Sequence, residues 1–424
     1  MFANDNIITA IEIGTSKIVV LVGRGDEDGV NIIGRGEAES AGCVLKGEIS
    51  EMQQAYELLN EALVRADESS GKRMADSGVF VLAITACGIG SFQGTGTVFI
   101  KNPEQRITEE DVNDAVDNAQ NTPLPQGQVS INSFDSYYLI DGVRRVRNPV
   151  DQIGAKLEAF EHVIHGNANR IENFRSLLRD AGLGENITLV HSGIADAYSV
   201  LTEEEKENGV LLVDMGSGTT EYVVIYNMGV LASGSLTIGF DHVANDLALG
   251  LGLPMSRCRE MLSDGTLAGY FRESAGVVEV KNANGSVTRI PISSFEKIVD
   301  LRLGEIFELI RDRVSPDGLL RTLGCGGVIT GGGAMFDRTP QVFRETFNFP
   351  VRVGAPIRGS GATTDMNNPR YSTICGALAY GNLCLNIEMS RNAPGVMGSL
   401  SRIFRRAVDG LWRSLANLKH SMKV

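Results

Sequence analysis

Three glycine-rich turns, each placed after a β-like run, have the residue types that bind phosphate groups. They read EIGTSK at 12–17, DMGSGTT at 214–220 and ITGGGAMF at 329–336. Glycine lets the backbone approach a phosphate closely and direct its N–H groups towards it. Hydroxyl groups in the first two turns add donors, namely Thr15, Ser16, Ser217, Thr219 and Thr220. Two such turns facing each other would clamp a triphosphate, and the third would pass flat beside a nucleoside through Gly331, Gly332 and Gly333.

A carboxylate ends the run before each of the first two turns. These residues are Glu12 and Asp214. Because Mg²⁺ keeps most of its water shell, either carboxylate can hold the ion through water. No residue is assigned as the base that would activate water, so the catalytic residues stay unknown.

The first two turns also repeat each other at a distance. Aligning IITAIEIGTSKIVVLV with the run around DMGSGTTEYVV pairs Glu12 with Asp214 and Gly14 with Gly216, an offset of 202 residues. One glycine turn is more often an ordinary hairpin without a ligand, but the set of three favours nucleotide binding. The P-loop pattern is absent, and neither turn has G-x-G-x-x-G opening a helix, which excludes a dinucleotide fold. The repeat indicates a duplicated architecture.

Composition limits the class of protein. The chain has 424 residues, of which 43% are apolar, and a net charge of −13. This length predicts roughly two to four structural units, and the acidic balance argues against nucleic acid as a partner. The six cysteines form no C-x-x-C pair, so we expect reduced thiols in a cytoplasmic protein. We find no membrane-spanning run and no secretory signal.

The C-terminal tail has the opposite charge to the body. Residues 401–424 carry six lysines and arginines against Asp409, a net charge of +5, so residues 1–400 carry −18. Large apolar residues follow helical spacing, with basic residues beside them: Leu400, Ile403, Phe404, Leu411, Trp412, Leu415 and Leu418, flanked by Arg405, Arg406, Arg413 and Lys419. Packing on the body, a coiled coil or a partner groove are alternatives. An interfacial helix on an anionic membrane fits best, with each basic residue contributing about 1 kcal/mol.

Several segments resemble known families. The paired phosphate turns and the late GGG turn are similar to the actin, Hsp70 and sugar-kinase superfamily. More narrowly, the chain resembles the FtsA family of bacterial actin-like cell-division proteins from about residue 7 to 424. The segments that carry this resemblance are AIEIGTSKIVVLVG, the insert near 86–162, SGIADAYSVLTEEEKENGVLLVDMGSGTTEYVV, VITGGGA, YSTICGALAYG and the basic tail.

This resemblance implies an α/β, actin-like fold with duplicated lobes, an inserted FtsA-type subdomain and a C-terminal amphipathic helix. The expected divisions are lobe I, 1–85 with 163–200 and 366–388; the inserted subdomain, 86–162; lobe II, 201–240 with 305–365; a smaller subdomain of lobe II, 241–304; a flexible linker, 389–398; and the membrane-binding helix, 399–424.

The resemblance also implies the site and its ligand. ATP with Mg²⁺ is expected between the lobes. The matching positions are Gly14, Thr15, Ser16 and Lys17 in the first phosphate segment, Asp214, Gly216, Ser217, Gly218 and Thr219 in the second, and Gly331, Gly332 and Gly333 in the adenosine segment. Glu12 stands where actins and kinases usually have Asp, which puts fast hydrolysis in doubt.

The implied role is in cell division. FtsA-like proteins polymerise on the cytoplasmic face of the membrane at the division site, bind the C-terminal peptide of the tubulin-like FtsZ, and recruit later division proteins through the inserted subdomain. Arg302 and Glu305 match the FtsZ-binding positions, although a solvated i,i+3 ion pair is the alternative. A pilus-assembly homologue, a small-molecule kinase and an Hsp70-like chaperone remain alternative functions.

Overall fold

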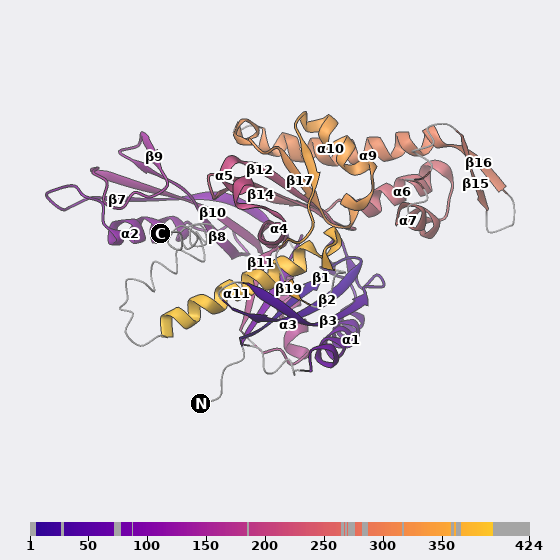
Figure 1. The fold of residues 1–424 in the computed structure, drawn as a ribbon, viewed down its shortest axis with the longest axis horizontal. Coiled ribbons are helices and arrows are strands. Elements are labelled where there is room, and N and C mark those ends of the chain that lie inside the picture. Colours follow the sequence, from indigo (N-terminus) through magenta and orange to yellow (C-terminus); the bar gives the residue numbers. More distant parts are fainter. Residues whose placement is uncertain are drawn as a thin grey trace.

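The computed structural model describes residues 6–26, 29–71, 78–86, 88–184, 186–263, 267, 269, 276–281, 287–315, 318–357, 360–361 and 366–392. Two sheets with helices on both faces form two lobes, and a further sheet projects from one end (Figure 1).

A six-stranded mixed sheet forms the core of lobe I, in the order β11-β6-β1-β2-β3-β19. Its strands are β1 (Ile7–Ile13), β2 (Lys17–Gly25), β3 (Val30–Glu39), β6 (Val79–Ile84), β11 (Ile187–His191) and β19 (Ser360–Gly361). The central strands are rich in β-branched residues and are buried on both faces. Helices α1 (Met52–Ser70) and α3 (Ala168–Asp180) pack on one face. Helices α4 (Ser192–Val200) and α11 (Ser372–Asn392) pack on the other, and β4 (Val44–Leu45) pairs with β5 (Glu48–Ile49).

Lobe II repeats this topology. Its sheet has the order β14-β13-β12-β17-β18, with β12 antiparallel to β13 and parallel to β17, just as β1 pairs with β2 and β6. The strands are β12 (Val210–Met215), β13 (Thr220–Tyr226), β14 (Gly229–Leu236), β17 (Gly327–Thr330) and β18 (Val351–Val353). The duplication predicted from the two turns is therefore confirmed at the level of strand order.

The outer face of lobe II carries the helices α6 (Phe240–Leu251), α7 (Met255–Ser263), α9 (Ile292–Val314) and α10 (Arg338–Phe347). The hairpin β15 (Val277–Lys281) and β16 (Val287–Pro291) lies at this end of the molecule (Figure 1). The shorter elements are α5 (Glu203–Asn208), η2 (Leu319–Thr322), η3 (Gly332–Met335) and η5 (Pro369–Tyr371). Helix α9 runs through the boundary expected at residue 304, and α11 continues through residues 389–392 of the expected linker. The other expected boundaries stay predictions.

The projecting sheet is the inserted subdomain, at the opposite end of the molecule from β15 and β16 (Figure 1). It comprises β7 (Gly90–Phe99), β8 (Gln128–Ile140), β9 (Arg144–Val146) and β10 (Lys156–Asn167), in the order β7-β10-β8-β9, with α2 (Glu109–Gln120) packed on one face. Helix α2 begins with the capping box that the sequence predicts: Thr108 accepts from the Asp111 N–H, and Asp111 accepts from the Thr108 N–H.

A line of buried hydrogen bonds, which we call the β14 seam, joins this inserted sheet to lobe II. His162 Nε2 lies 2.7 Å from Ser233 Oγ, and the Ser91 hydroxyl donates to the Ser233 carbonyl at 2.8 Å. The Ser136 hydroxyl donates to the Val230 carbonyl at 2.7 Å. Asn132 of β8 is also hydrogen-bonded to β11 of lobe I, so the subdomain is tied to both lobes.

The β14 seam should make stability depend on pH. Burial, with a smaller effect from His191, lowers the pKa of His162 to about 3. Below about pH 6.5 the unfolded chain binds a proton here that the folded chain does not, so stability falls as the pH falls. Lowering the pH from 7.5 to 5.5 should cost about 1.4 kcal/mol through this group. In urea unfolding, His162→Gln should remove that part of the acid-induced loss.

Ser233→Ala is the control for this prediction. It removes the hydrogen-bond partner but leaves the buried imidazole, so the free energy of unfolding should fall at both pH values and the pH dependence should persist. Equal pH dependence in His162→Gln and wild type would contradict the prediction.

Candidate functional site

A cleft of about 850 Å³ lies between the lobes and is lined by all three glycine-rich turns. This size lies within the range of small-molecule sites. The residues predicted to bind nucleotide all line it: Gly14, Thr15, Ser16, Lys17, Asp214, Gly216, Ser217, Gly218, Thr219, Gly331, Gly332 and Gly333. The structure therefore brings together segments that are more than 300 residues apart in the sequence.

The first two turns have the same geometry. The Gly14 N–H donates to the Lys17 carbonyl at 2.9 Å, and the Gly216 N–H donates to the Thr219 carbonyl at 3.0 Å. Their tips meet, because a Cβ on Gly218 would overlap Thr15 Oγ1 and lie 3.0 Å from Lys46 Cα. Glycine at position 218 therefore lets the two hairpins approach each other.

The third turn lies against the end of β12. Gly331 has a φ of +83°, which favours glycine, and a Cβ there would overlap Asp214 Oδ1 and lie 2.6 Å from the Met215 carbonyl oxygen. A Cβ on Gly333 would lie 2.6 Å from Met215 Cγ. The backbone of this turn is thus packed directly on Asp214, the acid at the start of the second phosphate segment.

Asp214 is buried among groups that the sequence did not suggest. The Thr373 hydroxyl lies 3.0 Å from Asp196 Oδ1 and 3.5 Å from Asp214 Oδ2. Burial, reinforced by the charge of Glu12, raises the pKa of Asp214 to about 6. Burial and the charge of Asp214 raise the pKa of Asp196 well above its usual value. Asp214 is therefore the more readily ionised of this pair.

Glu221 is a second buried acid at the cleft, and sequence reasoning missed it. Its carboxyl group accepts from the hydroxyls of Thr85 and of Ser235, the latter at 3.0 Å, and lies 3.4 Å from Thr219 Oγ1. Burial, followed by the charge of Asp214, raises the pKa of Glu221 to about 8, so it holds a proton at neutral pH. The one signal in the sequence was an acid inside the otherwise apolar strand TEYVVIY.

Glu12, predicted as a Mg²⁺ contact, has a partner in the cleft. Lys17 Nζ lies 3.0 Å from Glu12 Oε2, and both side chains are largely buried. Among the described residues, no three His, Cys, Asp or Glu side chains are arranged to hold a metal ion directly. The lining contains more acids than bases: Glu12, Glu39, Asp214, Glu221 and Asp241 against Lys17, Arg259 and Arg370.

The predicted partner-binding residues lie on α9, away from the cleft lining. Arg302 pairs with Glu305 one turn later, as the solvated ion-pair alternative expects. It also pairs with Asp246 of α6, with 2.5 Å between Arg302 Nε and Asp246 Oδ2. The hydrogen bond to Asp246 raises the pKa of Arg302. The guanidinium therefore already has two carboxylate partners.

The predicted membrane-binding helix, 399–424, lies outside the described residues. Within the part of the chain that the structure describes, no helix combines the length and apolar character needed to cross a bilayer.

Solved structures share this fold. A PilM–PilN type IV pilus biogenesis complex matches with a TM-score of 0.60 at 15% identity, covering 88% of this chain and 98% of that one. MreB5 of Spiroplasma citri bound to ADP matches with a TM-score of 0.55 at 13% identity, covering 92% of this chain and 100% of that one. These similarities confirm the actin-like fold predicted from the sequence.

Sequence comparisons identify the family. One family model, described as the SHS2 domain inserted in FtsA, matches residues 88–165, and another, cell division protein FtsA, matches residues 211–376. Cell division protein FtsA of Pseudomonas aeruginosa is 31% identical over 92% of both chains. That of Escherichia coli K12 is 29% identical over 93% of this chain and 95% of the relative. The chain therefore belongs to the FtsA family of actin-like cell-division proteins.

Proposed function

We propose that the cleft binds ATP with Mg²⁺ and that the bound nucleotide fixes how the two lobes close. The observation that carries this proposal is the meeting of three glycine-rich turns around one cleft of about 850 Å³. Two actin-like neighbours of this fold, structures of MreB5 from Spiroplasma citri, are described as bound to ADP and to AMPPNP. Their ligands support a nucleotide in the corresponding cleft here.

The chemistry of the lining fits a magnesium nucleotide. The two hairpins offer backbone N–H groups and hydroxyls to phosphates, while the glycines of the third turn leave room beside a nucleoside. The lining is already rich in acids, and each of its three cations has a carboxylate partner: Lys17 pairs with Glu12, Arg259 with Asp241, and Arg370 with Glu37. A polyphosphate would meet net repulsion there unless a divalent cation came with it. Asp214 and Glu12 would hold that cation through water.

The buried acids favour a nucleotide clamp over a fast hydrolase. A general base has to be ionised and has to reach the attacking water. Glu221 is protonated at neutral pH and is hydrogen-bonded to hydroxyls, so it is a poor base. Asp214 is the ionised acid, but it lies against Gly331 and Thr373. We therefore propose weak ATPase activity at most.

The cellular role proposed here is that of a membrane-bound filament. The chain would polymerise on the cytoplasmic face of the cell membrane at the division site, tether FtsZ through Arg302 and Glu305, and recruit later division proteins through the inserted subdomain. Family membership supports this role over a small-molecule kinase or a pilus-assembly protein, since the match to the pilus complex is 15% in identity. The tail would supply the membrane contact, and the filament would add many weak tails together.

Nucleotide binding can be tested at Gly331. Isothermal titration of the wild type with ATP or ADP should show binding that needs Mg²⁺ and weakens in EDTA. Gly331→Ala should reduce affinity at least about tenfold, because its Cβ would overlap Asp214 and displace the turn.

Gly182→Ala is the matched control for that substitution. Gly182 has a similar φ of +81°, but nothing lies within 4 Å of the added Cβ. It should share the backbone strain, about 1 kcal/mol, and keep wild-type affinity. Absence of ATP and ADP binding by folded wild-type protein would refute the proposed function.

The FtsZ contact makes a second prediction. Arg302→Glu should weaken binding of an FtsZ C-terminal peptide, because an acidic peptide would then face three carboxylates. Asp246→Asn should strengthen binding, since it releases part of the Arg302 guanidinium. Fluorescence anisotropy with a labelled peptide measures both effects.

Arg257→Glu on α7 is the control, because Arg257 and Glu260 form the same i,i+3 pair on a neighbouring helix. It should leave peptide affinity unchanged. Wild-type affinity in Arg302→Glu would remove this assignment.

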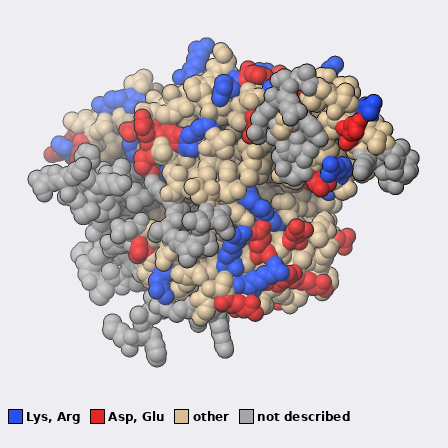
Figure 2. Space-filling model, turned by 45° about the vertical axis from the view of Figure 1, so that its right-hand side comes forward, with Lys and Arg blue, Asp and Glu red and all other residues tan. Residues whose placement is uncertain are grey.

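The tail makes a third prediction. On the face shown in Figure 2, basic and acidic side chains lie side by side over the lower body. With 1–400 at a net charge of −18, an anionic leaflet should repel the body, so contact should depend on the tail. Deleting residues 399–424 should abolish co-sedimentation with anionic vesicles, and neutral vesicles should reduce it for the full chain. Vesicle binding that survives the deletion would contradict this prediction.

A further inference from the structure

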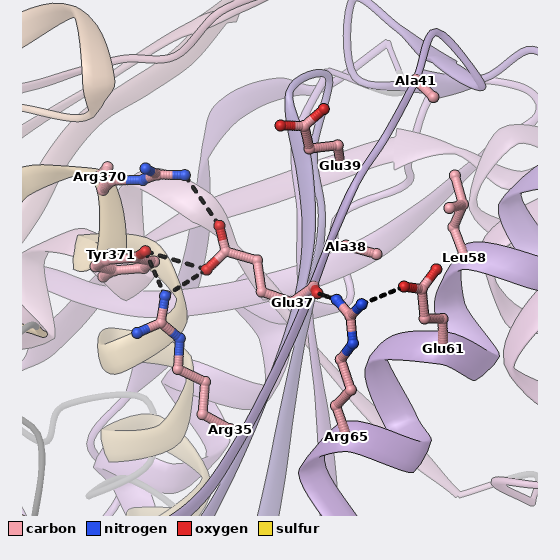
Figure 3. Close-up of a pocket in the computed structure, with 10 residues that line it drawn as sticks. All are labelled: Arg35, Glu37, Ala38, Glu39, Ala41, Leu58, Glu61, Arg65, Arg370 and Tyr371. Carbon is pink, nitrogen blue, oxygen red and sulfur yellow. Dashed lines mark hydrogen bonds and ion pairs between the residues drawn. The ribbon is translucent and has the colours of Figure 1, made fainter.

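A second hollow, of about 690 Å³, adjoins the nucleotide cleft at strand β3 of lobe I (Figure 3). The two cavities share Glu39, Ala41 and Arg370 in their linings. Arg35 and Glu37 come from β3, Arg65 from α1, and Arg370 and Tyr371 from η5, directly before α11. The hollow is therefore where η5, at the start of α11, passes over β3 of the lobe I sheet.

Three cations surround the ring of Tyr371. The ring centroid lies 4.6 Å from Arg35 Cζ, 5.1 Å from Arg370 Cζ and 5.3 Å from Lys17 Nζ. All three lie within the distance at which a cation is attracted to an aromatic face. Lys17 is the cation of the first phosphate segment and lines the cleft, so the ring of Tyr371 reaches the cleft through this side chain.

The Glu37 carboxylate fixes this ring in place. The Tyr371 hydroxyl donates to Glu37 Oε2 at 3.0 Å and accepts from Arg35 Nη2 at 2.5 Å. Arg370 Nη2 lies 2.9 Å from Glu37 Oε1, and Arg35 Nη2 lies 2.5 Å from Glu37 Oε2 (Figure 3). Burial opposes ionisation of Glu37, but its hydrogen bond with Arg35 and the charge of Arg370 outweigh burial and lower its pKa. The carboxylate is thus ionised at neutral pH and joins β3 to η5.

The register of the sheet explains why these side chains meet. In the β2–β3 pair, Lys17 lies opposite Glu39 and Val19 lies opposite Glu37. Paired residues point to the same face, so Lys17 and Glu37 both face α11. The ring of Tyr371, at the start of that helix, therefore lies over this end of the sheet.

We infer that Tyr371, held by Glu37, is a positioning residue for Lys17 and thereby sets nucleotide affinity in the cleft. The inference rests on the proposed function. Lys17 pairs with Glu12, and the aromatic ring supplies a further attractive contact for its ammonium group. Without the ring, Lys17 loses the cation–π contact that holds its ammonium group at the first hairpin. Less positive charge would then offset the repulsion between the acids of the cleft and the phosphates.

A double-mutant cycle tests whether the ring acts through Lys17. Mg·ATP affinity is measured by titration calorimetry for wild type, Tyr371→Leu, Lys17→Gln and the double variant. Tyr371→Leu should weaken binding about tenfold, whereas Tyr371→Phe, which keeps the ring and loses only the hydroxyl contacts to Glu37 and Arg35, should weaken it less, by about threefold. In the Lys17→Gln background, Tyr371→Leu should change affinity less than about threefold, because there is no ammonium left to position.

Glu37→Gln is a second route if Tyr371→Leu folds poorly. It breaks the carboxylate links without opening the core and should weaken binding about fivefold, again only when Lys17 is present. Glu61→Gln is the matched control, since Glu61 lines the same hollow but pairs with Arg65. Its affinity should equal that of wild type.

The outcomes separate the two proposals. If the wild type binds nucleotide and Tyr371→Leu weakens binding by the same factor with Lys17 and with Gln at position 17, this inference is overturned and the proposed function stands. Equal losses in Tyr371→Phe and Tyr371→Leu would also overturn it, because the ring would then have no part. A wild-type protein that binds no nucleotide would overturn both.

Discussion

The close packing around the Asp214 carboxylate is the constraint on which the cleft depends. Asp214 is the last residue but one of β12. The backbone of Gly331 lies against it without room for a Cβ, and the Thr373 hydroxyl of α11 lies 3.5 Å from its Oδ2. Behind Thr373, Asp196 of α4 is fully buried. Asp214 and Gly331 belong to the lobe II sheet and the turn after it, whereas Thr373 and Asp196 lie on helices that pack against the lobe I sheet. A ligand site built in this way exists only when both lobes are packed together.

Much of this arrangement is local enough to be predicted from the sequence. The hairpins at Gly14 and Gly216 close with equivalent hydrogen bonds, because glycine and the flanking β-branched runs determine turn and strands within a few residues. Their repetition predicted a duplicated architecture, and the strand orders of the two sheets confirm it. The capping box at Thr108 is likewise a short-range pattern.

The residues that sequence reasoning missed owe their positions to long-range packing. Thr373 meets Asp196 across 177 positions, and Arg35 meets Tyr371 across 336. No local periodicity encodes such contacts, so an acid such as Glu221 reads only as an irregularity in an apolar strand. Arg302 has one contact that could be predicted and one that could not. Its pair with Glu305 follows from the i,i+3 spacing of a helix, whereas its pair with Asp246 depends on how α6 packs on α9.

The inserted subdomain limits how the two lobes can move. Its strands β7 and β10 adjoin β6 and α3 of lobe I in the sequence, and Asn132 of β8 is hydrogen-bonded to β11 of lobe I. The buried hydrogen bonds of the β14 seam go to β14 of lobe II. The same strand carries Ser235, which binds Glu221 at the cleft, two residues from Ser233 in the β14 seam. Strand β14 therefore contacts a cleft acid through Ser235 and the inserted subdomain through Ser233. Any rotation of lobe II against lobe I has to bend the inserted sheet or break these contacts, so the state of the cleft and the orientation of the subdomain are mechanically linked through one strand.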